Sequence, residues 1–368
     1  MEFIDLKTQY KTYKEEIDKA IHNVLDSSQY VMGPEVREVE SQLADFVGVK
    51  HCITASSGTD TLLMSMMALD VGPGDEVITT PFTFISTVET ISFLGAKPVF
   101  ADIDLDTYNI NPDLIEKAIT PKTKAIMPVG LFGHMPDLAA INAIAEKYGL
   151  PVIEDAAQTF GATFEGKQSC GMTTIGSTSF FPAKPLGCYG DGGALFTDRD
   201  DIAESLKAIR VHGGVARHEY TRIGLNGRFD TIQAAVIKTK LPHFPEEIKK
   251  RSEIGSRYNE LLKDVCATPR IRENYTSTFA IYTIRIPERD RVASVLKDKG
   301  IPTSIYYPTP IYAQPAYKNL GIREGTFPVT EQACQEVLSL PMHPWLTEEA
   351  QDTIVEAVKE SATVGALS

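Results

Sequence analysis

The sequence predicts an α/β protein in which a large, mostly parallel sheet carries helices on both faces and is followed by a smaller α+β domain. Three observations support this fold class. Short apolar runs alternate with helical patterns in the first half of the chain, glycine or proline stands at most junctions, and a long charged helical segment follows residue 230. Parallel strands need crossover connections, and crossover helices cover both faces of the sheet.

The N-terminal part begins with two predicted helices, at residues 13–25 and 35–46, where apolar residues recur at helical spacing. Five β-like runs follow, and helical patterns separate them. The runs lie at 51–54, 76–79, 98–102, 125–129 and 152–154, and the helices at 60–69, 86–94, 112–119 and 137–148. Two further runs, at 177–181 and 194–197, have no helix between them. They predict either a hairpin at the edge of the sheet or an antiparallel insertion.

The C-terminal part changes pattern. The charged segment 246–263 predicts a helix between two domains. A strand at 279–286, a helix at 289–299, a strand at 303–307 and terminal helices predict a small α+β domain. We therefore expect a large domain over residues 1–244 and a small C-terminal domain over residues 245–368.

Composition excludes several classes of function. The 368 residues carry a net charge of −13, whereas a nucleic-acid-binding surface would be basic. The five cysteines are scattered without the CxxC spacing of a zinc site, and nothing suggests a disulfide framework. The N-terminus lacks a signal-peptide pattern, and no apolar run reaches the ~20 residues of a membrane helix. We expect a cytoplasmic protein.

An acidic residue, Asp155, follows the apolar run at 152–154. Ligands of open α/β sheets bind outside the carboxyl ends of the strands, so Asp155 lies where a ligand would bind. Capping of the next element is the alternative, because acids cap helices well.

Lys184 follows another apolar run and precedes four glycines between residues 187 and 193. A lysine amine forms Schiff bases with aldehydes once its surroundings depress its pKa. The glycines would let the backbone pass close to a bulky cofactor, although an exposed lysine in a glycine-rich loop is the alternative. Pyridoxal phosphate (PLP) needs a lysine for its aldehyde and an acid that keeps its ring nitrogen protonated. Lys184 and Asp155 supply both.

A phosphate group needs a third element. The segment 55–60 follows a strand and opens a helix, whose first N–H groups suit an anion. Ser56 and Thr59 add hydroxyl groups, although an ordinary helix cap also explains the segment. It matches neither a Walker loop nor GxGxxG, which disfavours nucleoside triphosphatases and dinucleotide dehydrogenases. Phe82 and Phe84 follow another strand end, where either could stack on a ring or belong to the core.

Taken in order, these segments resemble the DegT/DnrJ/EryC1/StrS sugar aminotransferases, which are PLP enzymes of fold type I, the aspartate aminotransferase-like fold. The resemblance extends over almost the whole chain. It rests on FIDL at 3–6, GPEV at 33–36, SGTD at 57–60, GPGDEV at 72–77, EDAAQ at 154–158, SFFPAK at 179–184, GDGG at 190–193 and NGRFD at 226–230.

The resemblance implies roles around the cofactor ring. Lys184 would hold PLP as a Schiff base and carry the proton that transamination moves. Asp155 would pair with the pyridine nitrogen, Gln158 would approach the ring hydroxyl, and Phe84 would stack on the ring. Some members of this fold have histidine in place of the lysine and dehydrate sugars, so lysine at position 184 favours transamination.

The resemblance also implies a phosphate site and a dimer. Gly58, Thr59 and Ser179 would hold the cofactor phosphate. Asn226 would reach the phosphate of the neighbouring subunit's cofactor, so the resemblance implies a homodimer.

Within the family, the chain most resembles enzymes that aminate C3 of UDP-2-acetamido-2-deoxy-3-oxo-glucuronic acid, with L-glutamate as donor, in bacterial O-antigen synthesis. A uronic acid carries a carboxylate, which arginine binds bidentately. Arg228 is the candidate, and an ion pair with Asp230 or another acid is the alternative. Tyr306 and Tyr307 are candidate sugar contacts. Close relatives often have histidine where Tyr306 stands, and tyrosine keeps a hydrogen-bonding tip without the imidazole.

Two other functions remain open. A 4-keto-6-deoxy sugar linked to dTDP, GDP or UDP would have no carboxylate for Arg228. A PLP-binding regulatory protein would bind the cofactor without turnover, but the combination of lysine, aspartate and phosphate-binding segment favours an enzyme.

Overall fold

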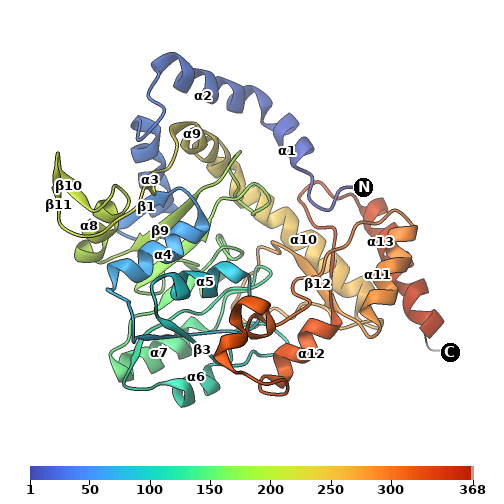
Figure 1. The fold of residues 1–368 in the computed structure, drawn as a ribbon. Helices are drawn as coiled ribbons and strands as arrows, with labels where there is room; N and C mark the ends of the chain where they lie inside the picture. Colours follow the sequence, from blue (N-terminus) through green and yellow to red (C-terminus); the bar gives the residue numbers. More distant parts are fainter. Residues whose placement is uncertain (366–368) are drawn as a thin grey trace.

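The computed structural model describes residues 1–365, with the side chains of residues 1–362 (Figure 1). A four-stranded sheet, in the order β1-β9-β8-β5, and a three-stranded sheet, in the order β3-β2-β4, form its centre. Parallel bridges between Ile126 and Val152 and between Val129 and Asp155 join the two into one continuous sheet. The strands are β1 (His51–Ala55), β2 (Glu76–Thr79), β3 (Lys97–Phe100), β4 (Thr123–Ile126), β5 (Ile153–Asp155), β8 (Ile175–Ser179) and β9 (Gly193–Thr197).

Strand direction confirms a mixed, mostly parallel sheet. β2 runs parallel to β3 and β4, and β5 runs parallel to β8. β9 runs antiparallel to both of its neighbours, β1 and β8. The two runs without a helix between them are therefore an antiparallel insertion, because β9 lies inside the sheet and not at its edge.

Helices cover both faces of the sheet, as expected. Alternate residues of a strand point to opposite faces. In β1, Cys52 packs on the side of α3 and α9, whereas Ile53 packs on the side of α4 and α8. In β2, Val77 packs with α4 and α5, and Ile78 packs with α6 and α7. These helices are α3 (Pro34–Val47), α4 (Gly58–Ala68), α5 (Ile85–Phe93), α6 (Pro112–Ala118), α7 (Leu138–Tyr148), α8 (Asp200–Ile209) and α9 (Thr231–Lys240).

The helix expected at residues 13–25 is confirmed as α2 (Lys14–Ser27). A short helix that was not expected, α1 (Leu6–Thr12), precedes it. The side chain of Asp5 accepts a hydrogen bond from the backbone N–H of Thr8 and so caps α1. Figure 1 shows α2 lying along α9, with which it makes extensive contact.

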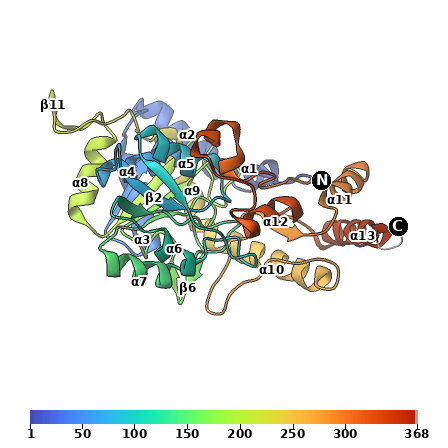
Figure 2. The same ribbon diagram turned by 60° about the horizontal axis from the view of Figure 1, so that its bottom comes forward.

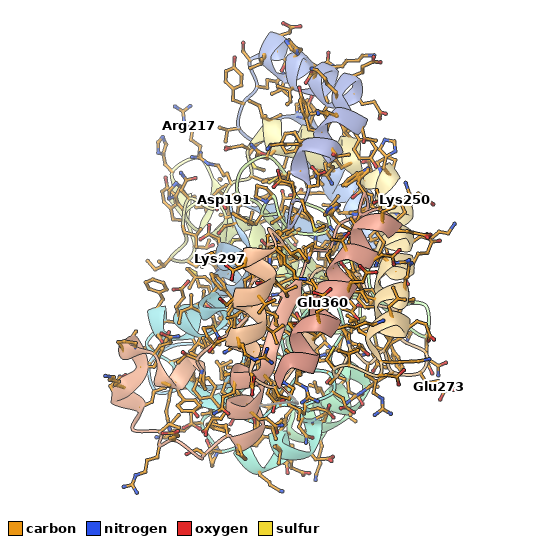
Figure 3. All side chains as sticks on the ribbon, turned by 90° about the vertical axis from the view of Figure 1, so that its right-hand side faces the viewer. Asp191, Arg217, Lys250, Glu273, Lys297 and Glu360 are labelled. Carbon is orange, nitrogen blue, oxygen red and sulfur yellow. The ribbon has the colours of Figure 1, made fainter. Side chains whose placement is uncertain are left out.

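The C-terminal part has its own core, built from residues between 254 and 358. β12 (Tyr282–Arg285) pairs antiparallel with β13 (Val337–Leu340), and α11 (Arg289–Asp298) lies beside α13 (Glu348–Gly365) in Figures 1 and 3. α10 (Phe244–Leu262) enters both cores, because Phe244 packs in the core of the large sheet and Tyr258 in the C-terminal one. We propose that the boundary between the large domain and the small C-terminal domain lies between residues 244 and 245, at the start of α10.

Two expectations for the C-terminal part are wrong. The segment 303–307 forms no strand: only Ser304 pairs, with Ser339 of β13. Pro308 and Pro310 follow closely, and proline has no N–H to donate to a ladder. β13 itself was missed, since only helices were expected there. α12 (Pro328–Glu336) and α13 are the terminal helices.

Two short hairpins and three 3₁₀ turns complete the described chain. The hairpins are β6 (Thr163–Phe164) with β7 (Lys167–Gln168), and β10 (Gly214–Ala216) with β11 (Glu219–Tyr220). The turns are η1 (Leu241–His243), η2 (Ile311–Ala313) and η3 (Pro315–Leu320). The β10–β11 hairpin extends away from the body in Figures 1 and 2. Within residues 1–365, no helix combines the length and the hydropathy that a membrane crossing requires.

Candidate active site

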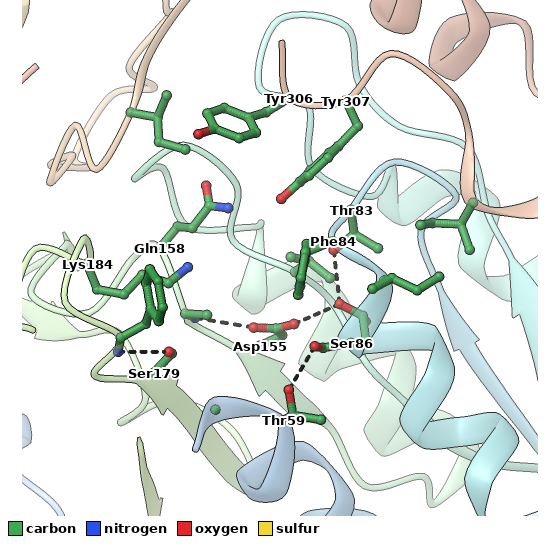
Figure 4. A pocket seen from close by; sticks show the side chains of 18 of the residues that line it. Thr59, Thr83, Phe84, Ser86, Asp155, Gln158, Ser179, Lys184, Tyr306 and Tyr307 are labelled. Carbon is green, nitrogen blue, oxygen red and sulfur yellow. Dashed lines mark hydrogen bonds between the residues drawn. The ribbon is translucent and has the colours of Figure 1, made fainter. Parts of the chain in front are cut away.

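A cavity of about 1090 Å³ opens where β1, β2, β4, β5 and β8 end. Carboxyl ends of parallel strands are where open α/β sheets bind ligands, so the location agrees with the expectation from sequence. Most of the candidate residues line it (Figure 4). They are Gly58, Thr59, Phe84, Asp155, Gln158, Ser179, Lys184, Tyr306 and Tyr307.

Asp155 ends β5 at the floor of the cavity and is only 5% exposed. Its Oδ2 accepts a hydrogen bond of 2.8 Å from the Thr87 hydroxyl, and its Oδ1 accepts one of 3.2 Å from the backbone N–H of Ala157. Burial raises the pKa of this carboxyl, while the two hydrogen bonds and the charge of Lys184 oppose the rise. A further cation beside Asp155 would offset the cost of burying the carboxylate.

Lys184 follows β8 in a tight turn, in which its backbone N–H donates to the carbonyl oxygen of Phe181 at 2.8 Å. The residue is half-buried, and its side chain enters the cavity from the side opposite Phe84 (Figure 4). Burial lowers the pKa of the Lys184 amine, and the carboxylate of Asp155 partly opposes the shift. A lower pKa increases the fraction of neutral amine, which is the nucleophilic form.

The helix α4 begins at one end of the cavity, as expected for a phosphate site. A Cβ atom on Gly58 would lie 2.6 Å from Cβ of Ser179, so only glycine lets the start of α4 approach the end of β8 this closely. The first N–H groups of a helix lack acceptors within it and suit an anion. Ser57 caps the helix by accepting from the N–H of Asp60 at 3.0 Å. The segment is thus both a helix cap and a candidate anion site.

Ser56 departs from the expectation that it adds a hydroxyl to this site. Its Oγ donates to the carboxylate of Asp60 at 2.5 Å, and its N–H donates to the carbonyl oxygen of Gly227. It is not among the residues that line the cavity. Thr59 does line the cavity, and its hydroxyl is 2.8 Å from that of Ser86.

Phe84 stands between the sheet and the upper wall of the cavity. It is 55% exposed, whereas Phe82 is 1% exposed and packs in the core. A large exposed aromatic side chain inside a cavity is suited to stack on a flat ligand. Gln158 is buried, and its Oε1 accepts from the N–H of Phe132 at 2.7 Å, which fixes the side-chain amide at the cavity wall.

The four glycines after Lys184 have another role than the one expected. A Cβ atom would lie 2.5 Å from the Pro182 carbonyl oxygen at Gly187, and 2.7 Å from the Thr178 carbonyl oxygen at Gly193. At Gly190 and Gly192 it would meet side chains of α9 and of the segment that precedes α9. None of the four lines the cavity. They let the loop that carries Lys184 pack against protein atoms, not against a cofactor.

Three hydroxyl residues of the site were missed by sequence reasoning. Thr83, Ser86 and Thr87 line the cavity around the start of α5. The hydroxyl groups of Thr83 and Thr87 are 2.9 Å apart, and Thr87 donates to Asp155, so Thr83, Thr87 and Asp155 are linked in series by hydrogen bonds (Figure 4). A run of hydroxyl residues after Phe82 was the available signal.

Asn226 and Arg228 do not join the other candidates, since neither lines this cavity. Oδ1 of Asn226 accepts from Nε of Arg228 at 2.8 Å, and Asn226 is exposed. The alternative considered for Arg228 was an ion pair with Asp230 or another acid, and none of the ion pairs between described side chains includes Arg228. The two side chains therefore form an exposed pair outside the cavity of their own chain.

Loops of the C-terminal part and the N-terminus make the upper wall. The ring of Tyr307 packs 6.0 Å from that of Phe82 and 6.4 Å from that of Phe84, between centroids. Tyr306 packs against Phe3, whose carbonyl oxygen accepts from the N–H of Met342. Burial raises the pKa of Tyr307, so its hydroxyl keeps its proton and can donate to a ligand.

Two curated relatives are similar over nearly their whole length. One, from Pseudomonas aeruginosa, is named UDP-2-acetamido-2-deoxy-3-oxo-D-glucuronate aminotransferase; the two chains are 52% identical over 347 residues, 94% of this chain and 96% of the relative. The other, from Geobacillus stearothermophilus, is named pleiotropic regulatory protein and is 44% identical over 361 residues, 97% of each chain.

Among solved structures, NtdA of Bacillus subtilis with bound cofactor PMP superposes with a TM-score of 0.90. It is 30% identical and covers 98% of this chain and 83% of its own. The family model described as DegT/DnrJ/EryC1/StrS aminotransferase family matches residues 11–359. With that match over most of its length, and with the lysine, the aspartate and the helix N-terminus gathered in one cavity, the chain belongs to the DegT/DnrJ/EryC1/StrS aminotransferase family.

Proposed function

We propose that the protein is a PLP-dependent aminotransferase that moves an amino group from L-glutamate to a nucleotide-linked keto-sugar. The proposed acceptor is C3 of UDP-2-acetamido-2-deoxy-3-oxo-glucuronic acid, for bacterial O-antigen synthesis in the cytoplasm. The observation that carries the proposal is the shared cavity of Lys184, Asp155 and the N-terminus of α4, which are the three groups that PLP needs. The name of the relative from Pseudomonas aeruginosa supports the choice of sugar.

PLP fits the cofactor end of the cavity. When bound, it supplies an electron sink that stabilises negative charge on the carbon beside the transferred nitrogen. Asp155 lacks a full cationic partner at the cavity floor, and a protonated ring nitrogen would be that partner. The exposed face of Phe84 would stack on the ring. The N-terminus of α4, with Thr59 and Ser179, would receive the phosphate.

Lys184 has two proposed tasks. Its neutral amine, favoured by the lowered pKa, would hold the cofactor aldehyde between turnovers. Once the amino donor displaces it, the free amine would move a proton between the donor's Cα and C4′ of the cofactor. The backbone of Lys184 is fixed by its hydrogen bond to Phe181, and the carboxylate of Asp155 attracts the protonated amine.

The substrate end of the cavity needs positive charge from elsewhere. Among the described residues that line the cavity, the charged ones are Asp155, Lys184 and Asp191. A UDP-linked uronic acid carries a diphosphate and a carboxylate, which arginine binds well. A second copy of the chain would supply Asn226 to the cofactor phosphate and Arg228 to the sugar carboxylate, which makes a homodimer part of the proposal.

The surface around Arg228 supports this dimer. The β10–β11 hairpin and the residues after it expose Val215, Tyr220 and Ile223, of which Ile223 is 85% exposed. Large apolar side chains gathered on a projecting element are typical of an interaction surface. Figure 3 shows Arg217 of the same hairpin pointing away from the body. The hairpin would therefore cross to the second subunit.

Two alternatives remain distinguishable. An acceptor of the 4-keto-6-deoxy class would not use the positive charge of Arg228. The name of the relative from Geobacillus stearothermophilus favours a regulatory protein without turnover. The hydrogen bonds that link Thr83, Thr87 and Asp155 favour an enzyme, because they align a carboxylate that binding of the cofactor alone does not need.

Absorbance spectra test the proposal. We expect the PLP-loaded protein to show a band near about 420 nm that moves to about 330 nm with L-glutamate, as PLP chemistry requires. The 3-keto-uronate should then restore the first band, and a 4-keto-6-deoxy sugar should not. A faster response to the deoxy sugar would overturn the choice of acceptor. A spectrum that no amino donor changes would contradict the aminotransferase and favour the regulatory protein.

A further inference from the structure

The loop that carries Lys184 is tied to the sheet on one side. Residues 180–190 leave β8, and the N–H of Cys188 donates back to the carbonyl oxygen of Phe180 at 2.8 Å. The thiol of Cys188 also contacts the Phe180 carbonyl oxygen, at 3.0 Å. These bonds join the two ends of the loop. They do not fix the side of the loop that faces α9, here called its outer edge, which includes Gly187 and Tyr189.

Helix α9 holds that outer edge at two points. The N–H of Tyr189 donates to Oε1 of Gln233 at 2.7 Å, and Nε2 of Gln233 donates to the Tyr189 carbonyl oxygen at 3.3 Å. Two turns later, Nζ of Lys240 donates to the carbonyl oxygen of Gly187 at 2.5 Å. Residues seven apart lie on the same face of a helix. Gln233 and Lys240 thus bind the backbone of the loop from the same face of α9.

Lys240 is buried with a set of polar partners that leave it little freedom. It is 2% exposed, and its Nζ donates to Oε1 of Gln9 on α1 at 2.6 Å. Nε2 of Gln9 donates to Oε2 of Glu247 on α10 at 3.2 Å, and Glu247 is 4% exposed. Burial lowers the pKa of Lys240 to about 8, and the charge of Glu247 opposes the shift. Removing these polar groups from water is unfavourable, but their mutual hydrogen bonds fix them in one geometry.

This network has no atom in the cavity, since Gln9, Gln233, Lys240 and Glu247 do not line it. The network reaches the site through the backbone of the loop, because Lys240 binds the carbonyl oxygen of Gly187, three residues after Lys184. The packing at Gly187 tightens the link, because a Cβ there would lie 2.5 Å from the Pro182 carbonyl oxygen. The backbone of Gly187 thus lies close to that of Pro182, two residues before Lys184.

We propose that Lys240 and Gln233 are positioning residues that clamp the Lys184 loop, so that the amine is held ready to condense with the cofactor aldehyde. The inference rests on the proposed function. In the step concerned, Nζ of Lys184 attacks the aldehyde carbon, a C=N bond forms, and the aldehyde oxygen leaves as water. A preformed position of the amine speeds this step, because the loop need not be ordered first.

The test compares Lys240→Met with Lys238→Met. Lys238 lies on the same helix but pairs with Glu38 at the surface, so it is the matched control. In the protein free of PLP, we expect the backbone amides of residues 184 and 186–190 to exchange with deuterium roughly tenfold faster in Lys240→Met, since one charge-assisted hydrogen bond is lost. With PLP added, the band of the C=N bond should form roughly tenfold more slowly, measured on the folded fraction. Lys238→Met should match the wild type in both.

Gln233→Ala is the second variant, in case Lys240→Met does not fold. It removes the grip at Tyr189 while leaving the buried network in place, and it should raise exchange and slow PLP capture by a smaller factor. A wild-type rate of capture in a folded Lys240→Met or Gln233→Ala protein would overturn the clamp. So would faster exchange without slower capture, which indicates a purely structural role. Failure of the wild-type protein itself to capture PLP would instead contradict the proposed function.

Discussion

The two ends of the cavity are built differently. At the cofactor end, residues at strand ends and helix starts hold fixed positions, as in the hydrogen bonds from Thr83 to Thr87 and from Thr87 to Asp155. The substrate end is walled by loops and by apolar or aromatic residues such as Phe3, Ile281 and Tyr306. Under the proposed function, one chain would supply the groups for PLP chemistry, but the residues that line its cavity would not supply enough positive charge for an anionic sugar nucleotide.

The largest effect is expected at Lys184. Lys184→Ala removes both the amine that holds PLP and the proton carrier, so turnover should fall by at least about 10⁴-fold. Steady-state assays with L-glutamate and the keto-sugar check this. The melting temperature of the PLP-free variant should stay close to that of the wild type, which separates loss of chemistry from loss of fold. Substantial remaining turnover would contradict the assignment.

Asp155→Asn should have the next largest effect. The amide can still accept from Thr87 or Ala157, but it carries no charge to keep the ring nitrogen protonated. We expect PLP to remain bound and kcat to fall by about 10²-fold to 10³-fold. The rate of each half-reaction, followed by absorbance, measures the effect. An unchanged rate would mean that Asp155 only supports the cavity floor.

Arg228→Ala tests whether the substrate end is completed by a second subunit. The loss of charge-assisted hydrogen bonds should raise the KM for the 3-keto-uronate by about tenfold to a hundredfold, with the KM for L-glutamate unchanged.

Mixing Arg228→Ala with Lys184→Ala sharpens this test. A mixed dimer has one site in which both residues are native, so random mixing should restore about a quarter of wild-type sites. Activity equal to the sum of the separate variants would show that Arg228 does not act across subunits.

The smallest effect on turnover is expected at Glu154, which stands beside Asp155 but does not line the cavity. Burial raises its pKa to about 7, while Ser169 and the N–H of Cys170 donate to its carboxyl oxygens. The folded protein thus holds this proton more tightly than the unfolded chain. Its stability should fall as the pH rises from about 4.5 to about 7, by roughly 3 kcal/mol at most.

Glu154→Gln cannot titrate and should remove this part of the pH dependence. Urea unfolding at pH 4.5 and pH 7.5 measures it, with wild type and variant compared at each pH. If the two proteins show the same dependence on pH, the carboxyl does not titrate in this window. Turnover should be little changed, because Glu154 does not line the cavity.

Most of the residues that the sequence singled out for the cofactor do line one cavity, and there is a physical reason for this agreement. Strand ends such as that before Asp155 and helix starts such as that at Gly58 are local features, and their chemistry follows from where the sheet places them. Thr83, Ser86 and Thr87 escaped because hydroxyl residues are common in helix starts and turns. Only the three-dimensional packing brings Thr87 to Asp155, 68 residues away in the chain.

The substrate end could not be predicted in the same way. The expected strand at 303–307 is a loop, because pairing stops after Ser304 and two prolines follow. The β13 strand that pairs with Ser304 was hidden among helical patterns. The glycines after Lys184 were assigned to cofactor contact, yet contacts such as that between Gly187 and Pro182 are invisible without coordinates.

The proposed function depends above all on a covalent bond between Lys184 and the cofactor. The most direct measurement reduces the PLP-loaded protein with borohydride, digests it and maps the modified lysine by mass spectrometry, since reduction makes the C=N bond permanent. We expect a phosphopyridoxyl group on Lys184 and on no other lysine in stoichiometric amount. A group on another lysine, or none in protein that has been saturated with PLP, would contradict it.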